Sequence, residues 1–468
     1  MRVTSIFCAA ALALGGCASF KPQSISPAAI AAAYEARSLD DPALRAFIQR
    51  NTPRALTTWP PSQWDLASLT LVAYYYHPDL DVARAKWGVA QAGELSAGMW
   101  PNPTINANVQ RNTDTPSGTS PWTLGLNLDI PIETAGKRGY RIEQAKHLSE
   151  AARVAIVSTA WQVRSRVRAA WLDLHIALNT HEILLGQQRL QQTNVTLLEH
   201  RLAVGMASTP EVTLARIALT QSTLALNDAA RLQSDARTRL AGAVGLGSEA
   251  LARVAIAPYP LTQSPALPSS EVREQALLNR GDVLGSLAEY AASQSALQLE
   301  IAKQYPDVHL GPGYTWDQGA RKWNVGLSLV LPVLNQNEGP IAEARARRVQ
   351  AAASFNATQA RAIGEIEVAL AAYRASRDRL MAVQALRVEQ SSQLRRAEAS
   401  FAAGDTDRVA LVGTRLELSQ TALSLADAQA KTQQAWGALE DAMQWPWAAP
   451  GLLEAAIQDN PRPMKEDQ

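Results

Sequence analysis

The sequence predicts a mainly α-helical chain that contributes strands to a membrane β-barrel. Three observations point to this fold class: two hairpins of amphipathic strands, a very long stretch without proline after each hairpin, and recurrence of the whole plan about 200 residues downstream. Pro131 at the end of the first hairpin recurs as Pro332, and Gly205 after the long stretch recurs as Gly404. Because unrelated landmarks recur at nearly one spacing, we interpret the chain as an internal duplication.

The N-terminus is expected to be processed and lipid-anchored. Residues 1–16 combine Arg2 with a short apolar run, which predicts a cleaved signal peptide. Cys17 follows Leu14-Gly15-Gly16 in a segment that resembles a bacterial lipobox, and Ala18 after it points by the same resemblance to the outer membrane. We therefore expect acylation of Cys17, with an ordinary buried thiol as the alternative. No other apolar run is long enough for a spanning helix, so any membrane crossing is expected to use strands.

After the leader, the chain divides into a lipid-anchored arm and a first repeat. The arm covers residues 17–61 and includes a short helical piece around residues 27–36. The first repeat is expected at 62–245. It begins with a helix over residues 62–99 that Pro78 should interrupt at His77.

Residues 104–111 and 122–131 alternate apolar and polar side chains with a period of two, which predicts strands of about 103–111 and 122–131. On this pair alone, a half-buried hairpin on a soluble protein is an equal alternative. The second copy favours a barrel wall, with apolar side chains such as Leu124 and Leu126 facing lipid. The polar side chains assigned to the lumen are Thr104, Asn106, Asn108, Gln110, Asn127, Asp129, Asn324 and Ser328.

Behind the hairpin, residues 137–203 contain no proline and predict a helix of about 67 residues, roughly 100 Å long. Its small apolar residues suit close, coiled-coil-like packing. Gly205 and Thr209-Pro210-Glu211 then predict a stop and a returning helix that ends near Val244.

The second repeat is expected at residues 271–445, after a proline-rich linker at 246–270. It repeats the plan in order: a helix over 271–304, strands of about 307–316 and 322–332, and a long helix over 339–403 with its return to about Met443. Residues 446–468 form a C-terminal tail.

Four strands cannot close a membrane barrel, because open sheet edges are not tolerated in lipid. Three chains would supply twelve strands and an aqueous lumen. Tryptophans at matched positions near the strand ends predict an aromatic girdle, although a single Trp is more often a core residue. These are Trp100, Trp122, Trp316 and Trp323.

The duplicated plan resembles the TolC-like outer membrane factor family over almost the whole mature chain. The segment Pro131-Ile132-Glu133-Thr134-Ala135-Gly136-Lys137-Arg138 is similar to the E-x-G-G-K-R segment of the CzcC-like, cobalt-zinc-cadmium branch. Leu331-Pro332 through Asn337-Glu338-Gly339 to Ile341-Ala342-Glu343-Ala344 is similar to the partner segment of its second repeat.

This resemblance implies a homotrimer whose twelve-stranded barrel continues into a periplasmic α-helical barrel. The trimer would join an inner-membrane RND pump through a periplasmic adaptor (membrane fusion) protein. The adaptor would contact the helix-turn tips, for which simple helix turns are the alternative. The tip residues are Arg201, Leu202, Gly205, Met206, Phe401, Gly404 and Asp405, and the candidates for a periplasmic constriction are Glu211, Asp405 and Asp407.

No motif for catalysis, cofactor binding or a metal site is recognisable. His175 and His181 point to different sides of one helix, and the remaining histidines, His309 among them, have no ligand partners at a recognisable sequence spacing. Charged residues on the long helices, such as Arg164 and Glu365, are interpreted as solvated faces. A net charge of +1 gives no indication of a nucleic-acid partner.

The sequence therefore predicts a passive duct rather than an enzyme. Its expected role is the outer-membrane channel of an RND-type efflux system, with divalent heavy-metal cations as the substrate implied by the branch. The alternatives are a multidrug or organic-solute duct of the same family and, from another class, a structural lipoprotein rod in the periplasm.

Overall fold

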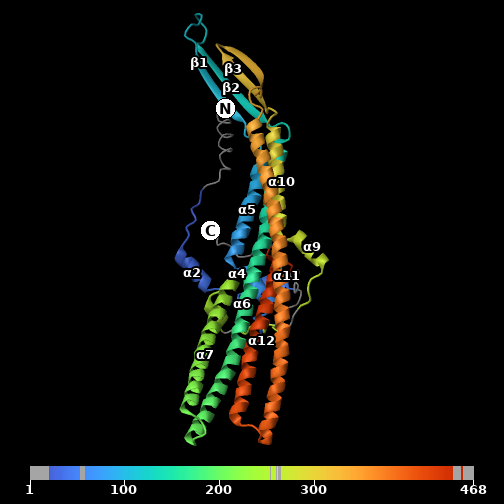
Figure 1. The fold of residues 1–468 in the computed structure, drawn as a ribbon. Coiled ribbons are helices and arrows are strands. Elements are labelled where there is room, and N and C mark those ends of the chain that lie inside the picture. The colour runs from blue at the N-terminus through green and yellow to red at the C-terminus, as the bar shows by residue number, and fades with distance from the viewer. Residues whose placement is uncertain are drawn as a thin grey trace.

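The computed structural model describes residues 20–52, 58–252, 254–259, 261, 265–445 and 455–456. The expected signal peptide, Cys17 and most of the expected tail lie outside these residues. The described chain is elongated, with a sheet at one end and long helices that run away from it (Figure 1).

Four antiparallel strands form one sheet in the order β1-β2-β3-β4. The strands are β1 (Thr104–Arg111), β2 (Trp122–Ile132), β3 (Val308–Asp317) and β4 (Ala320–Leu329). β2 pairs with β3, which sets the two hairpins side by side and leaves β1 and β4 as the edges. β4 ends earlier than the expected residue 332, because Leu329 already pairs with Val308, the first residue of β3, and no partner remains beyond it.

Four long helices form most of the molecule below the sheet. They are α6 (Lys137–Ala203), α7 (Thr209–Val244), α11 (Glu338–Ala403) and α12 (Arg408–Met443). Their limits agree with the sequence prediction to within about one residue, apart from α12, for which only the end was predicted. Among the described residues, no helix combines the length and the apolar character needed to cross a bilayer.

Shorter helices precede each hairpin and each is broken once. Before the first hairpin lie α4 (Leu66–Tyr76) and α5 (Pro78–Gly98), with the predicted break at His77. Before the second lie α9 (Ser270–Asn279) and α10 (Gly281–Ala302). The prediction of a single helix over residues 271–304 is therefore wrong.

The physical reason for the second break lies in Arg280, which is buried and extended, with φ −62° and ψ 133°. Its Nη1 donates to the carbonyl oxygen of Ala442 at 2.5 Å, and its Nη2 donates to Glu365 at 2.8 Å. The next residue, Gly281, lies so close to α6 that a Cβ would be 2.5 Å from the hydroxyl of Ser158. Tertiary contacts, rather than a proline, therefore interrupt the helix.

The N-terminal region contributes more than the expected arm. Besides α2 (Pro27–Glu35), which buries no side chain, it contains α3 (Pro42–Asn51), which buries Leu44, Phe47 and Ile48. α3 was not predicted, although Asp41 caps it and Pro42 begins it. A further short helix, α8 (Ser248–Ala252), follows α7.

Each half of the chain has its own hydrophobic core. The larger core joins α3, α4, α6 and α7 around Trp64 and Tyr74. The smaller core joins α9, α11 and α12 around Tyr373 and Trp436, whose rings lie 5.2 Å apart. Both cores lie in the helical part, so the sheet is held out at the end without a core of its own.

Candidate functional site

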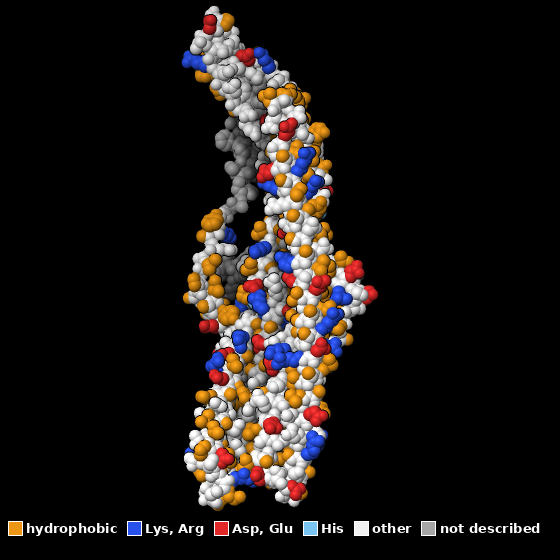
Figure 2. Space-filling model, in the orientation of Figure 1, with side chains coloured by type: hydrophobic (Ala, Val, Ile, Leu, Met, Phe, Trp, Pro, Cys, Tyr) orange, Lys and Arg blue, Asp and Glu red, His pale blue; other side chains and the backbone are white. Residues whose placement is uncertain are grey.

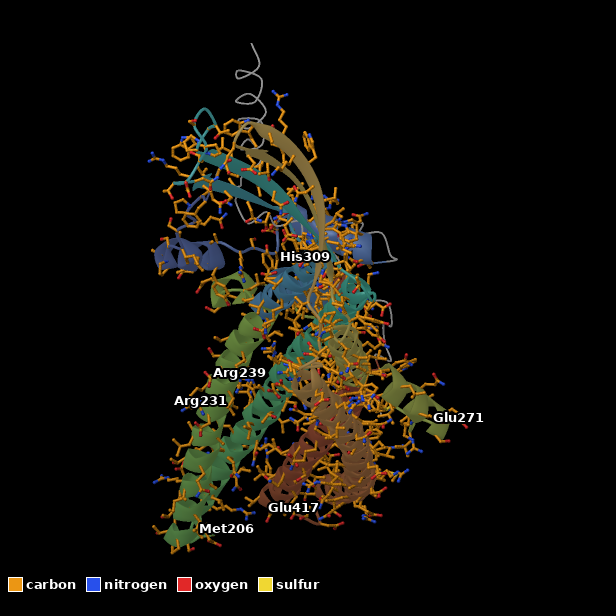
Figure 3. The ribbon with its side chains drawn as sticks, turned by 90° about the horizontal axis from the view of Figure 1, so that it is seen from above. Met206, Arg231, Arg239, Glu271, His309 and Glu417 are labelled. Carbon is orange, nitrogen blue, oxygen red and sulfur yellow. The ribbon has the colours of Figure 1, made fainter. Side chains whose placement is uncertain are left out.

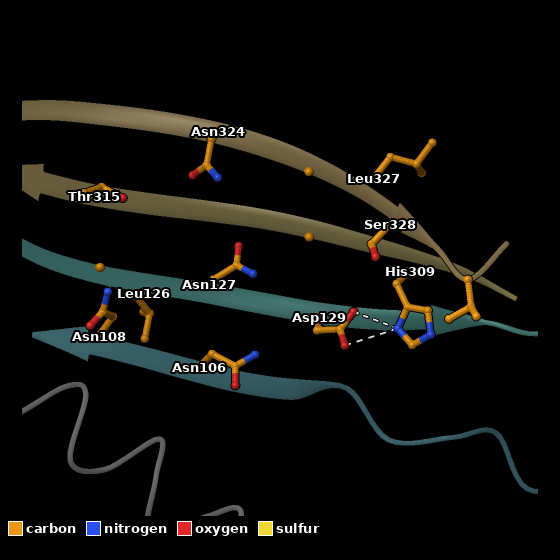
Figure 4. Close-up of a pocket in the computed structure, with 14 residues that line it drawn as sticks. Asn106, Asn108, Leu126, Asn127, Asp129, His309, Thr315, Asn324, Leu327 and Ser328 are labelled. Atoms are coloured by element: carbon orange, nitrogen blue, oxygen red, sulfur yellow. Dashed lines mark hydrogen bonds and ion pairs between the residues drawn. The ribbon is translucent and has the colours of Figure 1, made fainter.

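One face of the sheet is polar and hollowed (Figure 4). The hollow has a volume of about 670 Å³. Six of the residues assigned to the lumen line it, and Thr104 and Gln110 follow on the same face by alternation along β1 without lining it. The six are Asn106, Asn108, Asn127, Asp129, Asn324 and Ser328.

A glycine in β3 lets amides from both neighbouring strands approach each other over this face. Gly313 pairs with Asn127 on β2 and with Asn324 on β4. A Cβ at Gly313 would lie 2.7 Å from Asn127 Oδ1 and 2.5 Å from Asn324 Oδ1. A side chain there would displace both amides, so the polar lining depends on the glycine.

Sequence reasoning missed His309, which also lines the hollow. Its Nδ1 lies 3.0 Å from Asp129 Oδ1 and 3.2 Å from Oδ2 (Figure 4). The two residues are 180 positions apart in the chain and meet only because β2 pairs with β3. The register of that pairing is the signal that would have found the contact. Thr315 was missed in the same way.

The opposite face of the sheet is apolar and exposed. Ile105, Leu126 and Val325 are exposed by 69%, 55% and 76%, although they alternate with the polar residues of the hollow. A contiguous apolar surface of this kind calls for lipid or protein to cover it. On the side drawn in Figure 2, the charged side chains of the sheet lie near its loop end.

The four tryptophans divide between the two ends of the sheet. Trp122 begins β2, Trp316 pairs with Leu124 near the end of β3, and Trp323 lies near the start of β4, so all three are close to the loop end. Trp100 lies before β1 at the helix end, where the guanidinium of Arg138 stands 4.6 Å from its ring centroid.

The expected contact tips lie at the end of the molecule opposite the sheet (Figures 1 and 3). Gly205 has φ +74° and Gly404 has φ +80°, so both turns use the left-handed conformation that glycine tolerates. At the first tip, Met206 N donates to Arg201 O at 2.7 Å, and its side chain is 75% exposed. At the second, Asp405 N donates to Ser400 O at 2.9 Å.

Two of the three constriction candidates are engaged in capping the returning helices. Glu211 and Ser208 form a capping box at the start of α7, with Glu211 Oε2 accepting from Ser208 N at 2.6 Å. Asp407 accepts from Ala410 N at 2.9 Å at the start of α12. The hydrogen bonds from Ser208 hold the pKa of the Glu211 carboxyl below its ordinary value. The pKa of the Asp407 carboxyl is also lowered, chiefly by a hydrogen bond from Arg201 and then by the backbone N–H of Ala410. The third candidate, Asp405, is exposed.

The Asp407 carboxylate also connects the two tips. Its Oδ2 lies 2.6 Å from Nη2 of Arg201, the residue near the end of α6. The hairpin of the first half and the hairpin of the second half are thereby joined by an ion pair within one chain.

Midway along the helices, α6 and α12 share a buried ionic cluster. Arg164 Nη2 lies 2.8 Å from Glu440 Oε1, and both side chains are at most 5% exposed. Arg168 pairs with Asp441 and lies directly over Gly437, where any Cβ would overlap its guanidinium. The interpretation of Arg164 as part of a solvated face is therefore wrong. Glu365 is likewise engaged, through Arg280.

Burial raises the pKa of the Asp441 carboxyl, and the nearby Arg168 opposes that shift. This cluster is structural in character, because its charges are paired with one another. Among the described residues, no three His, Cys, Asp or Glu side chains are grouped so that they could hold a metal ion.

Comparison with known proteins relates the chain to outer membrane efflux proteins. The family model described as outer membrane efflux protein matches residues 73–246 and 272–443. The cobalt-zinc-cadmium resistance protein CzcC of Cupriavidus metallidurans is 27% identical over 263 residues, which cover 56% of this chain and 61% of CzcC. The nickel-cobalt-cadmium resistance protein NccC of Alcaligenes xylosoxydans is 29% identical over 286 residues, covering 59% of this chain and 62% of NccC. The matches thus span about three fifths of these relatives.

Solved structures show the same fold. The outer-membrane channel OprN aligns with a TM-score of 0.67 at 20% identity, over 92% of this chain and 99% of OprN. CusC aligns with a TM-score of 0.67 at 19% identity, over 91% and 99% of the two chains. VceC of Vibrio cholerae aligns with a TM-score of 0.65 at 21% identity, over 81% and 95%.

Proposed function

Because the chain belongs to the outer membrane efflux protein family, we propose that it is the outer-membrane channel of a tripartite efflux system. Three copies form a twelve-stranded barrel in the outer membrane, continued by a helical barrel in the periplasm. The channel is passive, and an inner-membrane RND pump drives transport through a periplasmic adaptor that contacts the helix tips.

The observation that carries this proposal is the open four-stranded sheet with its two unlike faces. β1 and β4 leave unpaired backbone groups at both edges, which lipid does not tolerate. Pairing β1 of one copy with β4 of the next removes every edge, and the polar hollow then faces the lumen while the exposed apolar face meets lipid. A periplasmic rod would leave this apolar face without a function.

The proposed cargo is a divalent heavy-metal cation. The support comes from the two relatives, whose names refer to resistance to cobalt, zinc, nickel and cadmium. We further propose that Cys17 is acylated and anchors the mature chain in the outer membrane. Metabolic labelling with palmitate, lost in a Cys17→Ser variant, tests that anchor.

The channel itself is tested with detergent-purified protein. We expect a trimer on native electrophoresis that dissociates on heating, and stable ion conductance after insertion into planar lipid bilayers. Folded trimers that never conduct would contradict the proposal. A deletion strain that becomes sensitive to cadmium, zinc or cobalt supports the metal cargo, whereas sensitivity only to organic solutes contradicts it.

A further inference from the structure

We propose that His309, oriented by Asp129, is a transient binding site for divalent transition-metal cations in the wall of the channel. This inference rests on the proposed channel function and names a residue that its cargo touches. His309 is the one imidazole in the four described strands. It lies on the polar face, in a hollow whose polar side chains otherwise offer amide, hydroxyl and carboxylate groups and whose rim includes Leu126, Leu327 and Val330.

The contact with Asp129 fixes how the imidazole presents itself. With both carboxylate oxygens within 3.2 Å, Nδ1 is the nitrogen that carries a proton and donates it. Nε2 is then the ring nitrogen left to bind a ligand. A carboxylate behind an imidazole is the arrangement that orients histidine in protein metal sites.

The surroundings leave room for an ion at the ring. Both side chains are 36% exposed and face the hollow of about 670 Å³. Gly311, two residues along β3, lines the same hollow and puts no side chain beside the pair. Ser328 pairs with His309 from β4 and also lines the hollow, so a hydroxyl is near the ring. Water would complete the coordination of a bound cation.

One imidazole per site makes the binding selective but weak. Nitrogen ligands favour zinc, cobalt, nickel and cadmium, whereas magnesium prefers oxygen. A conducting pore needs sites that attract the ion and release it again. In the proposed trimer, three equivalent pairs would lie at one level of the wall and provide such a step.

A competing explanation is that Asp129 and His309 only hold β2 and β3 in register. The two explanations differ in what they predict for metal ions. A structural pair would affect assembly and stability, and it would not make the current depend on which divalent cation is present.

The test uses single channels of the full-length trimer in planar bilayers at pH 7.5, in potassium nitrate, to avoid chloride complexes of cadmium. We expect Cd²⁺ to reduce the potassium current reversibly, at concentrations at which Mg²⁺ has no effect. His309→Gln should raise the half-blocking Cd²⁺ concentration at least about tenfold, and Asp129→Asn should raise it by about tenfold. Gln110→Ala, on the same face of the sheet but outside the hollow, is the control and should leave the block within about twofold of wild type.

A second substitution at His309 distinguishes loss of metal binding from failure of the trimer to assemble. His309→Cys places a thiol at the same position, and because thiolates bind cadmium strongly, it should restore or strengthen the block. An equal Cd²⁺ block in wild type and His309→Gln, or an equal block by Mg²⁺ and Cd²⁺, would overturn the inference. Absence of conductance in wild type would instead sink the proposed function, so the two failures are distinguishable.

Discussion

In each half of the chain, an ion pair ties the break before the hairpin to a long helix, but the positions of the acid and the base are exchanged between the halves. In the first half, Asp79 at the start of α5 pairs with Arg166 on the long helix α6 at 2.5 Å. In the second half, Arg280 before α10 pairs with Glu365 on the long helix α11 at 2.8 Å. The acid lies on the short helix in one half and on the long helix in the other.

The two halves have therefore kept a common backbone geometry while the side chains that stabilise it have diverged. Each break lies between two short helices and is tied by an ion pair to a neighbouring long helix. Asp79 and Arg166 are each about half exposed, whereas Arg280 is only 4% exposed. An exposed ion pair contributes little to stability, but the hydrogen bonds that a buried charged side chain makes are costly to lose. The two breaks should therefore respond very differently to the loss of one charge.

The largest effect is expected at Arg280. Arg280→Ala removes the donor to Ala442 O, Asp282 and Glu365, and the loss of these charge-assisted hydrogen bonds should destabilise the fold by about 3 kcal/mol. Asp79→Asn, the matched change in the first half, should cost less than about 1 kcal/mol. Thermal unfolding of detergent-solubilised protein, followed by far-UV circular dichroism, compares the two. Equal losses would show that the breaks are energetically equivalent after all.

The strand-to-helix junctions extend the same comparison. At the first residue of α6, buried Lys137 donates from Nζ to Tyr305 O at 2.6 Å and to Asp307 Oδ1 at 2.7 Å, which joins the first half to the second. Before α11, Asn337 has φ 62° and donates from Nδ2 to Glu300 O at 2.7 Å. The first junction is held by a buried lysine, and the second by a neutral side chain that donates to both the carbonyl oxygen and the carboxylate of Glu300.

We therefore expect Lys137→Met to cost about 2 kcal/mol, because charged hydrogen bonds at a buried site are lost. Asn337→Gly keeps the left-handed backbone without strain and should cost about 1 kcal/mol, the value of the hydrogen bonds alone. Chemical denaturation of the two variants in the same detergent measures both losses. A larger loss for Asn337→Gly than for Lys137→Met would reverse the proposed ranking.

Sequence patterns predicted the parts of this fold that depend on local rules. The absence of proline and the glycines at 205 and 404 located the ends of α6 and α11, and alternation located the strands. The break at His77 was predictable because Pro78 causes it, whereas the break at Arg280 depends on α6, α11 and α12 packing around it. A tertiary cause leaves no local signal.

In the candidate site, too, local patterns predicted the individual residues but not the contacts between distant segments. Its polar residues were predictable because each follows from alternation within its own strand. The contact between Asp129 and His309 depends on the β2–β3 register, and the contact between Arg164 and Glu440 depends on how α6 faces α12. Neither pairing can be read from spacing along one segment.

The smallest expected effect concerns the tips, where Arg201 of the first half and Asp407 of the second form the ion pair between them. The pKa of Asp407 is lowered, chiefly by Arg201 and then by the backbone N–H of Ala410. A lowered carboxyl pKa contributes stability that is complete above the ordinary value, about 3.9, and is lost as the pH falls through the lowered value. The contact should thus hold from neutral pH to about pH 5 and weaken below about pH 4.

Asp407→Asn isolates this ion pair, because asparagine caps a helix as well as aspartate does. Spin labels at Val204 and Ala403, in trimers diluted with unlabelled protein, report the distance between the tips of one chain. We expect Asp407→Asn to broaden that distance distribution at pH 7, and we expect acid to broaden it in the same way in wild type. The substitution should cost less than about 1 kcal/mol of stability, because both partners are partly exposed. Asp405→Asn, the exposed neighbour, should leave the distribution unchanged. If Asp405→Asn broadened it and Asp407→Asn did not, the contact between the halves would have to lie elsewhere on the tips.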